Sequence, residues 1–289
     1  MAKNHLPSKQ FVTRFKKIIW SYYAKHRRSM PWRDSITPYR IVVSEIMLQQ
    51  TQVDRVRVKF QSFLKKFPTW STLNAASNAD VLKEWSGLGY NRRALYLKRI
   101  AGEVLSNPGY SFLRKSKTEV ATRELEKRLI ELPGIGPNTA GSILAFAFNR
   151  PTIFIETNIR SVIIHHFFGH SKRKIADDAI RVIVELTLDK KGSREWYYAL
   201  MDYGTYLKKT ISNPSRKSVH HVKQSAFKGS NREMRSQILK IIMDKPVSIK
   251  SLQKLVDPHM NSPHNLKSNL IGLAKEGFIR SHKGKYVLV

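Results

Sequence analysis

The sequence predicts a mainly α-helical protein with a small, separate domain at its carboxyl end. Apolar residues recur at intervals of three and four along the first 210 residues, which is the period of a buried helix face. Alternating strand patterns are nearly absent before residue 240. The composition changes over Thr210–Asn231, where Ser, Asn, Lys, His and Gly follow one another without periodicity, and a new pattern begins after this stretch.

Helical periodicity begins early in the chain and returns after short breaks rich in Pro, Gly and Asn. The segments that carry it are Phe11–Tyr23, Tyr39–Leu48, Val53–Lys66, Ala79–Glu84, Arg93–Leu105, Val120–Ile130, Thr139–Phe148, Thr157–Phe168, Ala176–Leu188 and Glu195–Lys208. The first 210 residues are therefore expected to form many short helices packed on one another.

The carboxyl-terminal part has its own plan. We expect a helix over Arg232–Asp244, a short helix that opens at Ser248 and a third helix over Asn265–Glu276. Two short alternating runs then flank Lys283-Gly284, which indicates a β-hairpin. Three helices followed by a hairpin resemble a winged-helix domain, a module that binds DNA in many proteins and other proteins in some.

The chain carries 52 Lys and Arg residues against 21 Asp and Glu residues, a formal net charge of +31. Such an excess of one sign repels itself in a compact fold and favours a polyanionic partner, of which nucleic acid is the usual one. The absence of cysteine excludes disulfides, thiolate nucleophiles, Cys-bound zinc and iron–sulfur clusters. We expect no metal ion and no other cofactor.

The amino-terminal residues lack the apolar stretch of a signal peptide. No later window has the roughly 18 uncharged apolar residues that span a membrane. We therefore expect no membrane partner and a location in the cytoplasm with the nucleoid or otherwise inside the cell with DNA. We also expect a monomer.

A turn with two glycines lies between two predicted helices, in the string Leu132-Pro-Gly-Ile-Gly-Pro-Asn-Thr-Ala140. Gly134 and Gly136 let the backbone approach a ligand, and N–H groups beside a helix start form a phosphate site. This pattern predicts a helix–hairpin–helix, which binds the DNA backbone without reading sequence. A dinucleotide-binding turn does not fit, because a helix precedes the glycines and no third glycine follows.

Two glutamates are candidates for acid–base chemistry. Glu156 follows an apolar run and opens a predicted helix, where the helix N-terminus favours an ionised carboxylate. Helix capping alone would also explain it. Glu45 falls inside an apolar helical run, where a buried carboxyl group is either paired or held as an acid.

The string Pro31–Val53, the turn Gly87–Tyr90, the hairpin and Glu156 together resemble the helix–hairpin–helix (HhH-GPD) DNA glycosylases, and within them the adenine DNA glycosylases. The resemblance covers residues 10–208, and its most specific part is Ser-Glu-Ile-Met-Leu-Gln-Gln-Thr-Gln-Val. It implies a two-lobed helical fold with a DNA cleft. The implied partner is double-stranded DNA that contains a mispair or lesion.

The resemblance also implies a base-flipping mechanism in which two carboxyl groups have different tasks. Glu45 corresponds to the general acid that protonates a purine at N7; Glu156 corresponds to the acid that stabilises an oxocarbenium-like sugar, with Asn158 as its polar partner. Positions of the extruded-base pocket correspond to Arg28, Met30, Trp32, Leu48 and Asp202. Positions expected to contact DNA are Gln49, Gln50, Thr51, Leu88, Tyr90, Arg92, Gly134, Gly136, Asn138, Thr139, Lys208 and Lys209.

The sequence departs from the family pattern at four places. The family has Asp where this chain has Glu156, and its bifunctional members have a nucleophilic Lys at the position of Asn138, so we expect no Schiff-base lyase activity. The cysteines of the family's iron–sulfur cluster are absent, and Lys208 and Lys209 lie where that segment begins. The winged-helix-like segment stands where the adenine enzymes carry a domain that inspects 8-oxoguanine.

The domain organisation expected from the resemblance has two lobes, a linker and a small domain. These are residues 1–30 with 145–210, carrying Glu156; residues 31–144, a six-helix lobe carrying Glu45 and the helix–hairpin–helix at 128–145; a basic linker at 211–231; and the winged-helix-like domain at 232–289.

The predicted function is a monofunctional DNA glycosylase of base excision repair that removes adenine mispaired with 8-oxoguanine or guanine. One alternative is excision of thymine or uracil opposite guanine on a similar scaffold. A second alternative is a catalytically silent protein that binds damaged or unusual DNA, which the Glu at position 156 would explain.

Overall fold

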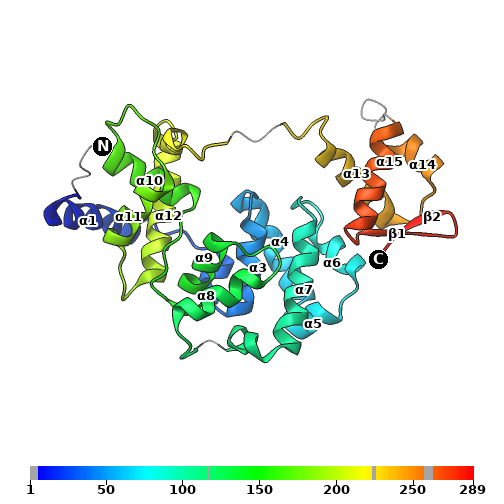
Figure 1. Ribbon diagram of the computed structural model, residues 1–289, viewed down its shortest axis with the longest axis horizontal. Helices are drawn as coiled ribbons and strands as arrows, with labels where there is room; N and C mark the ends of the chain where they lie inside the picture. Colours follow the sequence, from blue (N-terminus) through cyan, green and yellow to red (C-terminus); the bar gives the residue numbers. More distant parts are fainter. Residues whose placement is uncertain (1–5, 116, 223–225, 257–262) are drawn as a thin grey trace. The chain divides into compact units, whose positions relative to one another are not determined.

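The computed structural model describes residues 6–115, 117–222, 226–256 and 263–289 (Figure 1). Helices dominate these residues, and their strands form a single two-stranded hairpin, which confirms the prediction of a mainly α-helical fold. The chain divides into two compact units, one of residues 1–45 and 112–223 and one of residues 46–111 and 224–289. The lobe boundaries expected from the resemblance stay a prediction.

The first unit is built around α10 and α12, which lie side by side in Figure 1. Its core contains Phe15 of α1, Phe154 before α10, and Trp196 and Tyr197 of α12, each no more than 1% exposed. Burial of such a side chain contributes about 1.5–3 kcal/mol. The helices and turns of this unit are α1 (Lys9–His26), α2 (Pro31–Asp34), α3 (Pro38–Leu48) as far as Glu45, α8 (Thr122–Glu131), α9 (Pro137–Phe148), α10 (Thr157–Phe168), α11 (Asp177–Thr187), α12 (Ser193–Thr210) and the 3-10 turn η2 (Pro214–Lys217).

The packing of α12 on the start of α10 depends on Gly204. A Cβ atom at this position would lie 2.5 Å from the backbone oxygen of Asn158 and 2.7 Å from its Cβ atom. Because both neighbours belong to the first turn of α10, no side chain can be accommodated without displacing that turn. This contact therefore fixes where α10 begins.

The second unit contains a helical part and the carboxyl-terminal domain. In the helical part α5 packs on α7, and the buried side chains include Phe60, Phe63 and Trp85. Its elements are α4 (Val53–Lys66), α5 (Trp70–Ala75), α6 (Asn78–Trp85), α7 (Arg92–Ser106), α13 (Asn231–Asp244), α14 (Ile249–Leu255), α15 (Pro263–Lys275), β1 (Ile279–His282) and β2 (Lys285–Leu288). The 3-10 turn η1 (Pro108–Arg114) lies where the chain passes from the second unit to the first.

The carboxyl-terminal helices and hairpin agree with the winged-helix-like plan. Strands β1 and β2 are antiparallel, and the turn residues Lys283 and Gly284 have φ values of 47° and 73°. Two consecutive left-handed residues are typical of a two-residue hairpin turn that matches strand twist. Val247, just before α14, forms an isolated antiparallel bridge with Tyr286, so the hairpin is also bound to the helical part of this domain.

Three short elements were not predicted from the apolar periodicity of the sequence. The helices α2 and α5 and the turn η1 have four, six and seven residues, which is too short for an apolar pattern to repeat. Residues 214–218, inside the stretch predicted as a linker, form contacts within the first unit. There the backbone of Ile175 pairs with Lys217 and Val219, and Ser215 and Ser218 are buried.

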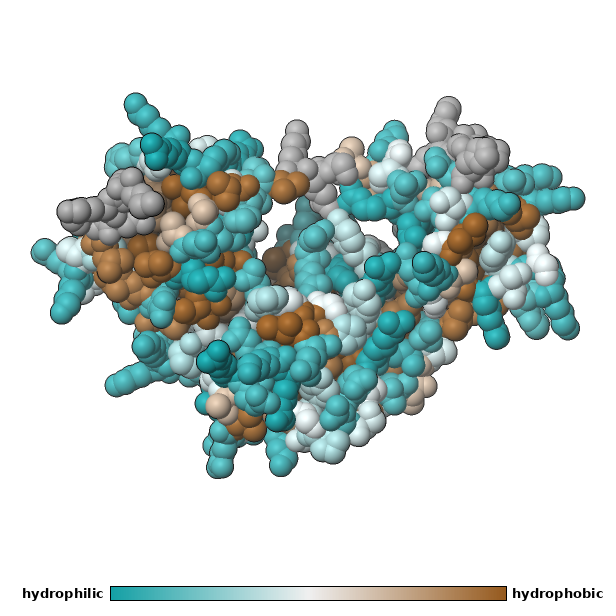
Figure 2. Space-filling view, viewed as in Figure 1, coloured by the Kyte–Doolittle hydropathy of each residue, from teal (hydrophilic) through white to brown (hydrophobic). Residues whose placement is uncertain are grey.

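Hydrophilic residues cover much of the face shown in Figure 2, and apolar residues gather over the first unit. Exposed apolar side chains of α1 and α11 are Phe11, Ile18, Val182 and Leu186. In the described parts of the chain, no helix combines the length and the apolar composition needed to cross a membrane.

Substitution Gly204→Ala is expected to lower the free energy of unfolding by about 1–3 kcal/mol, because the new methyl group overlaps the first turn of α10. Gly136→Ala is the matched control, since its Cβ atom would meet nothing within 4 Å. Urea-unfolding midpoints measure both. Equal midpoints for the two variants would contradict the packing described above.

Candidate active site

Glu45 lies near the end of α3 and retains partial solvent access. The Ser142 hydroxyl of α9 lies 2.6 Å from Glu45 Oε2 and 3.0 Å from the carbonyl oxygen of Thr139. Desolvation raises the pKa of Glu45 to about 7, the charge of Glu156 adds to the rise, and the Ser142 hydrogen bond and the charge of Arg33 oppose it. A carboxyl group with this pKa is protonated in a large fraction of molecules at neutral pH.

Glu156 is the N-cap of α10. Its Oε1 atom accepts hydrogen bonds from the backbone N–H groups of Asn158 (2.8 Å) and Ile159 (2.9 Å), and Oε2 accepts one from Asn158 Nδ2 (3.2 Å). Both carboxylate oxygens of Glu156 are thus engaged at the N-terminus of α10. The extra methylene of Glu, compared with the Asp of the family pattern, thus lies in a side chain that folds back onto its own helix.

The two glutamates are electrostatically coupled within the first unit, because the charge of Glu156 raises the pKa of Glu45. In the described part of the chain neither carboxylate forms an ion pair. The pair therefore combines a group that is readily protonated with one that is stabilised as an anion. This difference suits a reaction in which one group donates a proton and the other stabilises positive charge.

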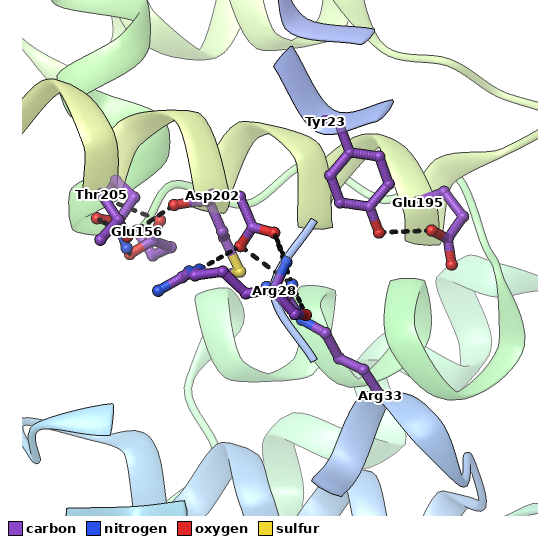
Figure 3. Close-up of polar contacts among 9 residues, drawn as sticks. Tyr23, Arg28, Arg33, Glu156, Glu195, Asp202 and Thr205 are labelled. Carbon is purple, nitrogen blue, oxygen red and sulfur yellow. Dashed lines mark hydrogen bonds and ion pairs between the residues drawn. The ribbon is translucent and has the colours of Figure 1, made fainter. Parts of the chain in front are cut away.

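Asp202 of α12 is buried beside this pair and binds two arginines (Figure 3). It accepts hydrogen bonds from the Arg28 backbone N–H (3.0 Å), from Arg28 Nε (2.7 Å) and from Arg33 Nη1 (3.0 Å). Both carboxylate oxygens thus accept hydrogen bonds from the arginines, and Asp202 orients Arg28 and Arg33. Its assignment to a base pocket stays a prediction.

The other predicted pocket residues differ in exposure. Met30 and Trp32 are 4% and 5% exposed, and Arg28 and Leu48 are partly exposed. Leu48 belongs to the second unit and the other three to the first. Their assignment to a base pocket stays a prediction.

Three residues near Glu45 were not predicted from the sequence: Arg33, Ser142 and Tyr198. The guanidinium carbon of Arg33 lies 4.2 Å from the centre of the Tyr198 ring, and that ring stacks on Phe146 at 4.7 Å. The Tyr198 hydroxyl is buried and has no hydrogen-bond partner among the described residues. Burial raises its pKa and the charge of Glu45 adds to the rise, so this hydroxyl stays protonated beside the acid.

The hairpin between α8 and α9 has the predicted shape. Gly134 has φ of 78°, Gly136 is the N-cap of α9, and both are exposed with Asn138. The side-chain oxygen of Asn138 accepts a hydrogen bond from the Ile155 backbone N–H at 3.1 Å. Asn138 thus links the hairpin to the segment that leads to Glu156, and phosphate binding by the turn stays a prediction.

In the second unit, Arg93 holds together two segments that contain residues predicted to contact DNA. Its guanidinium group donates to the carbonyl oxygens of Ile46 (2.8 Å) and Met47 (2.9 Å) at the end of α3 and to that of Gly89 (3.0 Å). Burial lowers the pKa of Arg93 to about 10, so it remains charged at neutral pH. The two loops that it joins contain Gln50 and Tyr90, which have φ values of 54° and 47°.

Residues of these two loops differ in their access to a ligand. Gln50 and Tyr90 are exposed, and Gln49 and Thr51 are partly exposed. Leu88 is 2% exposed, so its side chain is buried within the second unit, and its contact with DNA stays a prediction.

The carboxyl-terminal domain contacts the same turn. Arg232 Nη1 donates to the Tyr90 hydroxyl at 3.0 Å, and Glu276 binds both Arg92 (2.9 Å) and Arg235 (2.7 Å). Two of the predicted DNA contacts, Tyr90 and Arg92, are thus engaged within the chain.

The last turn of α12, in the first unit, carries two basic residues, Lys208 and Lys209. Lys209 is exposed and Lys208 is partly buried. Thr139, in the hairpin helix α9, is partly exposed. Burial lowers the pKa of Lys208, whereas the charge of Glu156 opposes this shift. Lys208 therefore lies within electrostatic reach of the candidate carboxylate.

Comparison with protein families identifies the region that contains these features. Residues 43–185 match the model described as "HhH-GPD superfamily base excision DNA repair protein". These residues belong to the HhH-GPD superfamily. The HhH-GPD region includes Glu45, the hairpin and Glu156, but ends before Asp202 and Lys208.

Similar proteins agree with this assignment. An adenine DNA glycosylase of Buchnera aphidicola subsp. Baizongia pistaciae is 32% identical over 193 residues, 67% of this chain and 52% of that protein. One of Mycolicibacterium smegmatis is 32% identical over 185 residues, 64% of this chain and 60% of that protein. The chain thus spans about half to three fifths of the length of these relatives.

Solved structures show the same fold. The structure of a thermostable thymine-DNA glycosylase matches with a TM-score of 0.58 and 21% identity, covering 73% of this chain and 93% of that one. A non-covalent Endonuclease III–DNA complex matches with a TM-score of 0.56 and 15% identity, covering 70% and 87%. At these identities the likeness establishes the HhH-GPD glycosylase fold.

Asp202→Ala is expected to lower the free energy of unfolding by about 3–5 kcal/mol, because it leaves the charge of Arg33 buried without its partner. The control Glu124→Ala breaks an exposed ion pair with Arg128, and it is expected to change the free energy of unfolding by about 0.5 kcal/mol or less. Urea unfolding measures both variants. A loss of stability no greater than that of the control would show that Asp202 does not hold the arginines in place.

Proposed function

We propose that the protein is a monofunctional DNA glycosylase that hydrolyses the N-glycosidic bond of a mispaired adenine, opposite 8-oxoguanine or guanine. The observation that carries this proposal is the pair of unlike carboxyl groups: a desolvated Glu45 and a helix-capping Glu156 whose charge reaches it. The similar proteins of Buchnera aphidicola and Mycolicibacterium smegmatis are adenine DNA glycosylases, which supports the choice of base.

In the proposed reaction, Glu45 protonates the departing base and Glu156 stabilises the positive charge that develops on the sugar. The bond between the base nitrogen and C1′ breaks, and the electron pair leaves with the base, which takes the proton of Glu45. Water adds to C1′, and its proton is released, so Glu45 can be reprotonated from solvent. No cofactor is required for this hydrolysis.

Ser142 has a defined part in the proposal because its hydroxyl has one proton and two acceptors within reach. When Glu45 is ionised, Ser142 donates to it. When Glu45 is protonated, the carboxyl O–H can donate to Ser142 Oγ while Ser142 donates to the Thr139 carbonyl oxygen. Both protonation states of the acid thus keep their hydrogen bonds, which eases the transfer of its proton.

The absence of lyase activity is proposed from the hairpin. Schiff-base chemistry needs an amine nucleophile, and the residue at the corresponding place is Asn138, whose carboxamide oxygen already binds the Ile155 N–H group. The expected product is therefore an intact strand with an abasic site.

The glutamates are tested by base release from duplexes that each contain one A·8-oxoguanine, A·G, T·G or U·G pair. Glu45→Gln and Glu156→Gln are expected to lower the single-turnover rate at least about a hundredfold, as expected for loss of a general acid or of charge stabilisation. Binding to the same duplexes is expected to be retained. Alkaline cleavage of abasic sites measures turnover, and gel-shift titration measures binding.

The outcomes of this panel separate the alternatives. Release only from T·G or U·G would replace adenine by thymine or uracil as the substrate. Binding without release from any of the four duplexes would identify a catalytically silent DNA-binding protein.

The pH dependence tests the role of Glu45. Because the acid must be protonated to donate, the rate of base release is expected to fall as pH rises through about 7. Ser142→Ala removes a hydrogen bond that lowers the pKa of Glu45, so this alkaline limb should move to higher pH. Ser62→Ala, at an exposed site of α4, should leave it in place. A shift to lower pH in Ser142→Ala would contradict the assignment.

A further inference from the structure

A row of aromatic rings from α1, α12 and α10 runs from exposed His26 to buried Tyr203 and half-buried His166, all within the first unit. Successive ring centres are separated by 4.7 Å (His26 to Tyr22), 5.0 Å (Tyr22 to Tyr206), 5.9 Å (Tyr206 to Tyr203) and 5.6 Å (Tyr203 to His166). The planes of neighbouring rings are inclined by only 31–37°. Neighbouring rings of the row are thus tilted toward one another, and Tyr22 also meets Tyr203 edge to face, at 5.2 Å and 72°.

One end of the row, at His166, is half-buried, and the other end, at His26 and Tyr206, is exposed to solvent and is called the open end. His166 is half-buried, burial lowers its pKa to about 4, and its Nε2 atom lies 3.2 Å from the Tyr203 hydroxyl. At the other end His26 is exposed and Tyr206 is 42% exposed. The packing of α1 on α12 is already supplied by buried Phe15 and Trp196, so it does not require the exposed ring area of Tyr206.

Positive charge lies beside the open end. Arg28 follows α1 by two residues, and Lys208 and Lys209 lie in the last turn of α12, two and three residues after Tyr206. Phosphate is the anion that accompanies a flat, stackable group in a nucleotide. A run of aromatic rings with Lys and Arg alongside is the arrangement by which proteins hold single-stranded nucleic acid.

The same end adjoins the candidate catalytic groups. Thr205, next to Tyr206, donates a hydrogen bond to Met201 O and lies 3.5 Å from Asn158 Oδ1, the partner of Glu156 (Figure 3). Tyr206 follows Asp202 by one helical turn, and the charges of Asp202 and Arg28 reach Tyr22. A nucleotide on these rings would thus lie close to one held at Glu156.

We propose that Tyr22, His26 and Tyr206, with Arg28, Lys208 and Lys209, form a subsite for an unpaired nucleotide of DNA, with its base stacked on Tyr206 and its phosphate at the basic side chains. The subsite would hold a nucleotide next to the one undergoing excision. The inference rests on the proposed function in taking DNA as the ligand, but it concerns binding and not base release.

The test is the binding of a short oligothymidine with one central 2-aminopurine, a base whose fluorescence is quenched when it stacks on an aromatic ring. The full-length protein is expected to quench it, and Tyr206→Phe is expected to do the same. Tyr206→Ala should lose the quenching and bind the strand more weakly, by on the order of tenfold. Phe11→Ala is the matched control, because Phe11 is a similarly exposed aromatic residue (41%) elsewhere on α1; it should resemble the unmodified protein.

A strand of the same length made only of abasic spacers separates stacking from charge. It should bind the unmodified protein and Tyr206→Ala equally, because it offers phosphates but no base. The proposal is overturned if Tyr206→Ala quenches 2-aminopurine as well as Tyr206→Phe does, or if it weakens binding of the abasic strand as much as that of oligothymidine. Circular dichroism of the variants checks that each is folded.

Failure of this proposal can be told apart from failure of the proposed function. Loss of quenching in Tyr206→Ala together with no base release from any mispair would support the subsite and reject the glycosylase activity. Base release from A·8-oxoguanine by the unmodified protein, together with unchanged quenching in Tyr206→Ala, would support the glycosylase activity and reject the subsite.

Discussion

The desolvation of one carboxyl group is the constraint on which the candidate site depends. Glu45 and Glu156 have the same side chain, yet α3 presents the first among apolar neighbours and α10 presents the second to its own backbone N–H groups. The free energy of removing a charge from water keeps the first readily protonated, while the helix N-terminus stabilises the charge of the second. Opposite environments thus give two identical side chains different chemistry.

Several contacts hold this difference in place. Gly204 lets α12 approach the first turn of α10, which positions the N-cap. Asp202, two residues before it, binds Arg28 and Arg33 and so ties the segment between α1 and α2 to α12. The charge of Arg33 also lowers the pKa of Glu45, so the ion cluster of Asp202, Arg28 and Arg33 influences the protonation of this acid.

The second unit uses a buried cation in a different way. The guanidinium group of Arg93 has no carboxylate partner among the contacts described and donates to backbone carbonyl oxygens at the end of α3 and in the turn before α7. Such an arrangement fixes loop geometry, and it does so where Gln50 and Tyr90 adopt left-handed backbone conformations. Gln50 is exposed, whereas the Tyr90 hydroxyl accepts a hydrogen bond from Arg232.

The sequence by itself determined the helical class, the hairpin at Gly134 and Gly136, and the identity of the two glutamates. These depend on local patterns: apolar periods, glycines in a tight turn, and a carboxyl group in an unusual context. Tertiary structure alone decided that Ser142 and Arg33 act on Glu45, that Asp202 is occupied by arginines and that Leu88 is buried. Those contacts join residues up to 174 positions apart, and no local pattern encodes such distances.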